Sequence, residues 1–252
     1  MPRYYALVEY DGSAYYGFQR QREGQPTIQA ELESALGQVV HRPVSITGAG
    51  RTDSGVHALG QVITFDVEWR HGSETLQRAL NANLPTAIAI LQLNEVSSTF
   101  HPRFDARRRT YAYHVYHAAV RSPLRRQRSW HVPRPLDVER MNQAAAHLIG
   151  VHDFATFGQP PQGENSVREV FTVGWQRHQD DILVFFIEAN AFLYRMVRSL
   201  VGSLKLVGEG AWTGEDFIAA LQACDRSRSG APAPAHGLYL VSVTYDNEEL
   251  RA

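Results

Sequence analysis

The chain has a single cysteine, almost no lysine and no long apolar run. Cys224 is the one cysteine among 252 residues, which excludes an internal disulfide and any metal site built from cysteines. The longest strongly apolar run, residues 182–187, is far too short to cross a bilayer. Glu9 and Asp11 follow the amino terminus without an apolar targeting core between them. We therefore expect a cytoplasmic protein.

Several catalytic motifs are also missing from the sequence. It contains no Gly-Lys-Ser/Thr phosphate loop, no His-Glu-x-x-His pair and no Gly-x-Ser-x-Gly turn. His114 and His117 are three residues apart on an expected strand, so they face opposite sides and cannot bind one metal together. Nucleotide-loop, two-metal and serine-hydrolase chemistry are therefore poor interpretations of this chain.

The charge of the chain is unevenly distributed. The net charge is −1, but residues 101–140 hold ten Arg and three acids, a local +7, which leaves −8 for the remainder. Such clustering is typical of a phosphate-binding face. Basic residues are 24 Arg and one Lys; arginine suits forked phosphate contacts, although genome composition would produce the same bias.

The main candidate for a functional site is the glycine-rich loop from Thr47 to Ala58. It holds three glycines at positions 48, 50 and 55, with Arg51 and Asp53 between the last two. Glycine reaches backbone angles closed to other residues and lets a ligand approach the main chain. The loop predicts either a small acid/base or nucleophile site or an ordinary turn whose Asp caps its own backbone. The pattern alone does not separate these two readings.

Hydrophobic spacing predicts the elements of the first half. Helical periodicity follows Pro26-Thr27, a second helix begins at Ser73, and residues 61–67 alternate as a half-buried strand. The expected order is strand, helix, strand, strand, helix, strand, over residues 3–10, 28–39, 44–47, 61–67, 73–83 and 88–93.

The second half nearly repeats this order. Strands are expected at 109–116, 168–175, 182–189 and 238–245, with helices at 138–148, 192–207 and 215–224. Residues 225–236 are rich in Arg, Ser, Gly, Ala and Pro, and predict a mobile loop. We therefore expect an α+β fold of two ferredoxin-like, RNA-recognition-like βαββαβ halves, residues 1–106 and 107–252. Their antiparallel sheets would join and leave a central cleft.

Aromatic and basic residues of the second half are candidates to accompany Asp53. Tyr111 and Tyr113 share one face of a strand, either as a buried stripe or as a platform on which a base stacks. Arg198 lies away from the apolar face of its expected helix, where it is either solvated or points at a carboxylate.

Taken together, the residues resemble one family, the tRNA pseudouridine synthase A (TruA) family. The resemblance covers nearly the whole chain, and many motifs match in order: residues 10–13 with 17–19, the loop 48–58, and residues 80–85, 100–106, 150–154, 192–198 with 201–202, and 233–240.

The resemblance implies isomerisation of uridine to pseudouridine at positions 38, 39 and 40 of the tRNA anticodon stem-loop. It also implies a homodimer, two halves around a basic cleft, and no cofactor or metal. Asp53 would be the catalytic residue, as a nucleophile or as the base that removes a ribose proton, and both roles stay open.

By the same resemblance, four residues would bind the substrate. Arg198 would pair with the Asp53 carboxylate, Tyr111 would pack on the target base, and Arg51 would fill the space that the uridine leaves. Leu238 would help form the apolar floor. The alternative is a non-catalytic RNA-binding protein with two RNA-recognition-like halves, in which Asp53 only shapes a turn.

Overall fold

The computed structural model describes residues 1–22, 24–160, 163–179 and 181–246. The chain forms two compact units, the first containing Met1–Arg107 and the chain from Tyr239 onward, the second Arg108–Leu238. Strand β10 (Leu238–Tyr245) pairs in parallel with β3 (His57–Asp66), matching Tyr239 to His57 and Leu240 to Ala58. This pairing places the last strand in the first unit, whereas the sequence led us to expect it in the second half.

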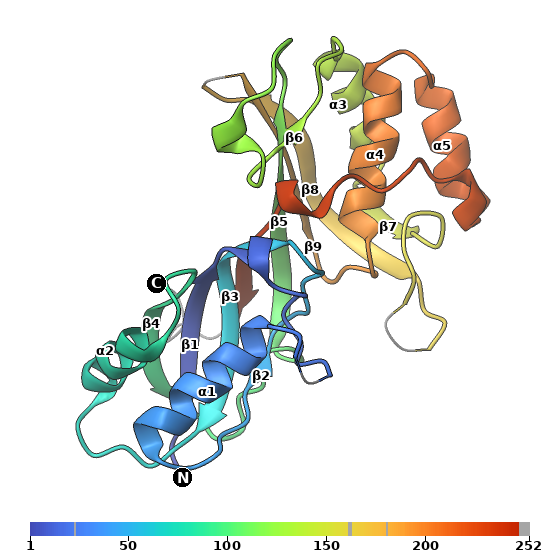
Figure 1. Ribbon diagram of the computed structural model, residues 1–252. Helices are drawn as coiled ribbons and strands as arrows, with labels where there is room; N and C mark the ends of the chain where they lie inside the picture. The colour runs from blue at the N-terminus through green and yellow to red at the C-terminus, as the bar shows by residue number, and fades with distance from the viewer. Residues whose placement is uncertain (23, 161–162, 180, 247–252) are drawn as a thin grey trace. The chain divides into compact units, whose positions relative to one another are not determined.

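The first unit is a mixed sheet with two helices on one face (Figure 1). Strand β3 pairs antiparallel with β1 and β2, β1 pairs antiparallel with β4, and the order is β4-β1-β3 with β2 beside β3. A short 3₁₀ turn, η1, follows β1. The elements are β1 (Arg3–Tyr10), η1 (Gly12–Ala14), α1 (Ile28–Val40), β2 (Thr47–Gly48), α2 (Ser73–Asn83) and β4 (Ile88–Val96).

Strand β3 is buried on both faces, although its sequence alternates like a half-buried strand. Ile63 and Phe65 pair with Ala6 and Tyr4 on one face. On the other face Val62 belongs to a cluster with Tyr5, Ala49, Phe100 and Tyr245. The cover on this second face comes from segments distant in sequence, so the alternation of β3 alone could not reveal it.

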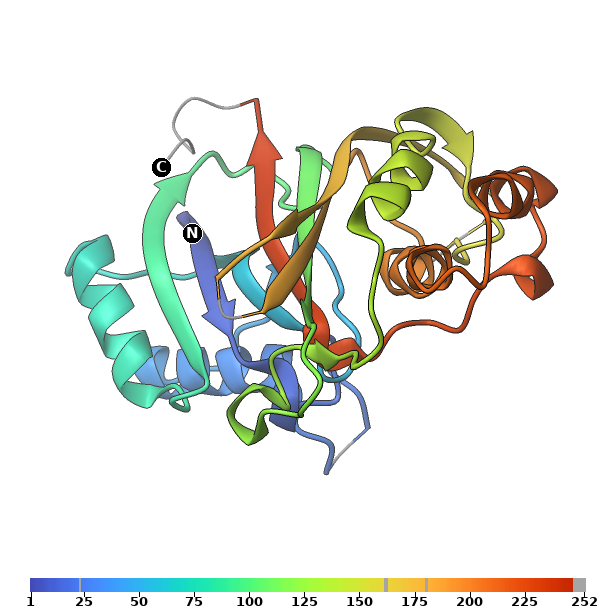
Figure 2. The same cartoon turned by 90° about the horizontal axis from the view of Figure 1, so that it is seen from above.

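The second unit has three helices over one face of its sheet (Figures 1 and 2). The strand order is β5-β9-β8-β7 with antiparallel pairs, and β6 pairs in parallel with β5. The elements are β5 (Ala106–Tyr116), η2 (Pro123–Arg125), β6 (Trp130–His131), α3 (Val138–Ala146), β7 (Gly150–Asp153), β8 (Val167–Arg177), β9 (Ile182–Ala189), α4 (Met196–Gly208), α5 (Gly214–Ala223), η3 (Arg226–Arg228) and η4 (Ala235–Gly237). The fold is therefore mixed α+β, and antiparallel pairing dominates its strands.

Helix α4 begins four residues later than its sequence predicts. Arg195 has a left-handed backbone, with φ of 62°, and Tyr194 forms an isolated antiparallel bridge with Gln159. The bridge uses backbone groups that a helix would need for itself, so the helix starts at Met196. Arg198 consequently lies in the first turn of α4.

The segment from 225 to 236 is hydrogen-bonded to α4. The expectation of a mobile loop is therefore wrong. The Gly230 N–H donates to Ser203 Oγ at 3.0 Å, and the Ala233 N–H donates to the Arg198 carbonyl at 2.9 Å. A Cβ at Gly202 would overlap the carbonyl oxygen of Ala231. The helix glycine therefore lets this segment approach the α4 backbone directly.

In the part of the chain that the structure describes, no helix has the length and apolar character needed to span a membrane.

A test of this packing is the pair Gly202→Ala and Gly214→Ala. A methyl group at 202 meets the Ala231 backbone, whereas the space around Gly214 is open. We expect Gly202→Ala to lower the free energy of unfolding by about 1–3 kcal/mol. Gly214→Ala should leave it unchanged or raise it by up to ~1 kcal/mol. Urea unfolding measures both, and equal stability of the two variants would contradict the packing described.

Candidate active site

The loop that carries Arg51 and Asp53 is held at its start by β3. The Ala49 N–H donates to the Val62 carbonyl at 2.8 Å, and Gln61 Nε2 donates to the Gly50 carbonyl at 2.9 Å. Gln61 is fully buried in β3. A buried amide needs hydrogen-bond partners, and the Gly50 carbonyl provides one for Gln61. This bond fixes the loop backbone three residues before Asp53.

The last residue of β1 and the chain that follows it hold the middle of the loop. The hydroxyls of Tyr10 and Thr52 share a hydrogen bond of 2.8 Å, and the Phe18 N–H donates to the Thr52 carbonyl at 3.1 Å. The Tyr15 carbonyl accepts from the Gly55 N–H at 3.3 Å. Both flanks of Asp53 are therefore bonded to residues 10–18.

Two glycines make this contact possible. A Cβ at Gly12 would overlap the carbonyl oxygen of Val56, and a Cβ at Gly17 would lie 2.7 Å from that of Thr52. Gly17 also has φ of 93°, a conformation that favours glycine. The loop and the segment after β1 thus meet backbone to backbone, and any side chain at either glycine would push them apart.

Asp53 is half-buried on this loop, and Arg51 is exposed. The turn after Asp53 is closed by its backbone carbonyl, which accepts from the Val56 N–H at 3.1 Å. Turn geometry is therefore supplied by the main chain and by Gly55, whose φ is 77°. These backbone groups define the turn from which the half-buried Asp53 side chain projects.

A buried histidine supports the end of the loop. His57 is 1% exposed, and its ring stacks on Tyr239 with centroids 4.7 Å apart. Its Nδ1 lies 3.2 Å from the Gly12 nitrogen and 3.1 Å from Asp11 Oδ1. A neutral Nδ1 accepts from Gly12, and a protonated one donates to Asp11. The sequence analysis missed this contact, although a histidine opening a buried strand four residues after Asp53 was a usable signal.

In the second unit, the two strand tyrosines have different environments. Tyr113 is fully buried, and its hydroxyl donates to the Pro234 carbonyl at 2.7 Å. Burial raises the pKa of its phenol far above the ordinary value, and the Arg198 charge opposes this only in part. Tyr111 is half-buried, with its ring edge-on to Phe192 at 4.9 Å. Tyr113 is therefore a core residue and cannot belong to a stacking platform.

Arg198 is partly buried beneath the segment that precedes β10. Its Nε donates to the Ala233 carbonyl at 2.7 Å, which together with the Ala233 N–H bond makes a two-way link. Leu238, 6% exposed, ends the same segment. His236 lies nearby: burial, and then the Arg198 charge, lower the pKa of its imidazole, while a backbone hydrogen bond at Ser129 opposes them. The second unit thus brings Arg198 and the 233–238 segment together.

The run Arg107 to Arg109 is largely engaged within the protein. Arg107 pairs with Asp246 at 2.6 Å, Arg108 with Glu188 at 2.8 Å, and Arg109 donates to the Asn190 carbonyl at 2.7 Å. Arg121, Arg126 and Arg128 are exposed close together on residues 121–129, the segment around η2. The exposed positive charge of residues 101–140 is therefore strongest around η2.

Among the described residues, no three His, Cys, Asp or Glu side chains gather as a metal ion would require.

The sequence is similar to that of known proteins over nearly its whole length. A family model described as tRNA pseudouridine synthase matches residues 6–105 and 144–246. The tRNA pseudouridine synthase A of Rhodospirillum rubrum is 43% identical over 250 residues, 98% of this chain and 89% of that protein. The proteins of the same name from Rhizobium meliloti and Pseudothermotoga lettingae are 45% and 40% identical over 97% of this chain and their full length.

The chain belongs to the tRNA pseudouridine synthase A (TruA) family. It is a tRNA pseudouridine synthase, an isomerase. This excludes the alternative of a purely RNA-binding protein. A solved H/ACA RNP bound to a substrate RNA containing 2'-deoxyuridine aligns with 10% identity and a TM-score of 0.39, over 81% of this chain and 43% of that one. That likeness is too low to bear on the assignment.

The environment of His236 predicts a pH dependence of stability. Its pKa is lower in the folded chain than the ordinary value near 6.5, so the neutral ring is favoured by folding. Its contribution to stability is present above about pH 6.5 and is lost as the pH falls through the folded pKa. We expect the wild type to lose more stability than His236→Gln between about pH 7.5 and about pH 5. Urea unfolding of both proteins checks this, and parallel pH curves would contradict it.

Proposed function

We propose that this isomerase acts at positions 38, 39 and 40 of the tRNA anticodon stem-loop, with Asp53 as its catalytic residue. Family membership supports the reaction. The observation that carries the residue assignment is the loop from Ala49 to Val56, which main-chain contacts fix on both sides of Asp53. A rigid backbone around a half-buried carboxylate provides the preorganisation that catalysis needs.

The chemistry requires one carboxylate and no redox partner. The bond between ribose C1′ and uracil N1 breaks, and a bond between C1′ and uracil C5 forms. The proton on C5 leaves, and N1 gains a proton, so atoms and electrons balance within the nucleotide. Asp53 either attacks the substrate as a nucleophile or removes a ribose proton. Both routes use the carboxylate of Asp53.

Four further residues complete the proposal as substrate-binding groups. Arg51, exposed beside Asp53, fills the space left in the RNA stack, because extruding a base costs a few kcal/mol. Tyr111, half-buried and braced by Phe192, packs on the uracil ring. Arg198 supplies positive charge from the first turn of α4, and Leu238 supplies apolar surface.

The finer architecture belongs to the same proposal. The order β4-β1-β3-β2 with antiparallel neighbours is what a split βαβ unit produces, and it supports a ferredoxin-like first half. We propose a matching second half, joined sheets with a basic cleft, a homodimer and a cytoplasmic location.

Replacing the candidate catalytic carboxylate tests the assignment. Asp53→Ala should lower tritium release from C5-labelled uridine in tRNA by about 100-fold or more, since it removes the reacting group. The tRNA dissociation constant should stay within about threefold, because binding depends mainly on phosphate contacts.

The matched control is Glu68→Gln, which removes an exposed acid just after β3 in the same unit and should keep full activity. Normal tritium release from Asp53→Ala would end the assignment of Asp53.

The exposed arginines around η2 predict a salt effect on tRNA binding. The double substitution Arg121→Gln with Arg126→Gln should weaken binding and reduce the slope of log K against log salt by up to about 1.8, at about 0.9 per lost phosphate contact. Filter binding at several salt concentrations measures the slope. Arg70→Gln removes one exposed charge from the first unit and serves as the control. An unchanged slope in the double variant would show that the η2 segment is not part of the RNA path.

A further inference from the structure

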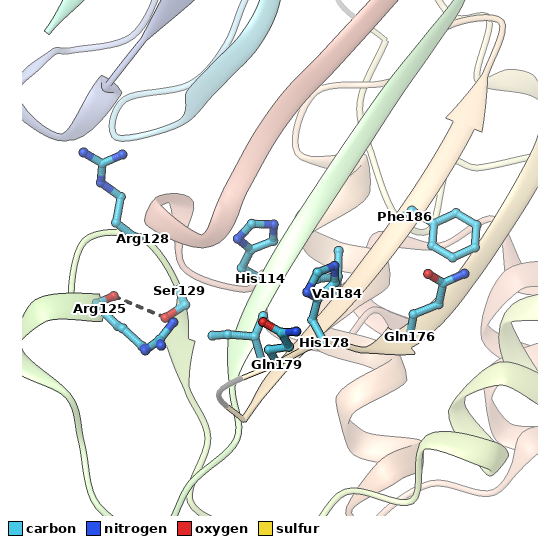
Figure 3. Close-up of a pocket in the computed structure, with 10 residues that line it drawn as sticks. His114, Arg125, Arg128, Ser129, Gln176, His178, Gln179, Val184 and Phe186 are labelled. Carbon is cyan, nitrogen blue, oxygen red and sulfur yellow. Dashed lines mark hydrogen bonds between the residues drawn. The ribbon is translucent and has the colours of Figure 1, made fainter.

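The second unit has a pocket on the sheet face opposite its buried core. Its volume is about 610 Å³, within the range of small-molecule sites. Along β9, Leu183, Phe185 and Ile187 point into the core, whereas Val184 and Phe186 line the pocket. Figure 3 shows Val184 and Phe186 with His114 from β5 and His178, which directly follows β8. The pocket lies wholly within the second unit.

One wall of this pocket is formed by the η2 segment, residues 121–129, which contributes Arg125, Arg128 and Ser129 to the lining. β6 pairs with the end of β5, matching Val115 to Trp130, and so returns the chain to the sheet. Just before β6, the backbone and hydroxyl of Ser129 both donate to the Arg125 carbonyl, at 3.1 and 3.2 Å. The Arg125 guanidinium lies over the Tyr116 ring, 5.5 Å from its centroid. The wall is therefore braced and not a free loop.

The side chains of the pocket favour an anionic, partly aromatic ligand. Arg125, Arg128, His114 and His178 line it, and none of its ten described lining residues is acidic. Guanidinium groups bind phosphate in a forked geometry. Opposite this wall, Phe186 offers a half-buried aromatic ring on the sheet surface (Figure 3). Phosphate groups on one side and a flat base on the other would satisfy both walls.

We infer that this pocket binds a nucleotide segment of the RNA substrate, away from the reacting uridine. Arg125 and Arg128 take its phosphates, and Phe186 with His114 stacks its base. The inference rests on the proposed function, because it gives the tRNA a further contact. An acidic protein segment fits less well, since its carboxylates would leave the aromatic wall without a partner, whereas base stacking on sheet aromatics is common in RNA recognition.

The test is equilibrium binding of a fluorescently labelled six-nucleotide oligouridylate, followed by anisotropy across salt concentrations. Arg125→Gln with Arg128→Gln should weaken binding about tenfold and reduce the salt slope by up to about 1.4, at about 0.7 per contact on single strands. Phe186→Leu should weaken binding about fivefold or more through lost stacking, without changing the slope.

The matched control is Arg177→Gln. Arg177 is exposed at the end of β8, and its side chain alternates to the face opposite that of Gln176, which lines the pocket. This variant should bind within about twofold of the wild type.

Two outcomes would overturn the inference: variants of the pocket that bind oligouridylate like the wild type, or a labelled hexaglutamate that binds as tightly as the RNA. Binding needs no turnover, so an active Asp53→Ala would sink the proposed catalytic residue and leave this test standing.

Discussion

The close approach of two backbones fixes the geometry around Asp53. Gly12 and Gly17 leave no room for a Cβ against Val56 and Thr52, so the segment after β1 and the candidate active-site loop pack as one body. The loop is then positioned by main-chain bonds from Tyr15 and Phe18. The main-chain bonds on both sides of Asp53 therefore fix the position of its backbone, and with it the point from which the carboxylate projects.

In the second unit, a glycine likewise allows two backbones to approach closely, here beside Arg198. Gly202 within α4 admits the Ala231 carbonyl, and Ala233, two residues further along, exchanges two hydrogen bonds with Arg198. Gly237 lies against the ring of Tyr113, where a Cβ would come within 2.6 Å. An arginine held through its Nε in this way has a defined direction for its remaining donors, whereas a solvated arginine samples many rotamers at an entropic cost when it binds.

Local signals in the sequence predicted local structure well. The periodicity of Ile28, Leu32 and Leu36 located α1, and the glycine pattern around Asp53 singled out the loop that the structure clamps. The failures came from long-range pairing. The Gln159–Tyr194 bridge delays the start of α4, and β10 pairs with β3 across most of the chain. Neither partner is visible within a window of neighbouring residues.

The distribution of positive charge on the surface also depends on contacts between residues that are distant in sequence. A count from the sequence gives every arginine between residues 101 and 140 one full positive charge. In the structure, however, Arg107 and Arg108 form ion pairs with Asp246 and Glu188. Surface pairs of this kind contribute little to stability, but they reduce the field that reaches a phosphate. Arg121 and Arg126 are exposed on a segment that β6 fixes to the sheet. In the RNA binding that we propose, the exposed Arg121 and Arg126 would therefore contribute more attraction than Arg107 and Arg108, whose charge an acid matches.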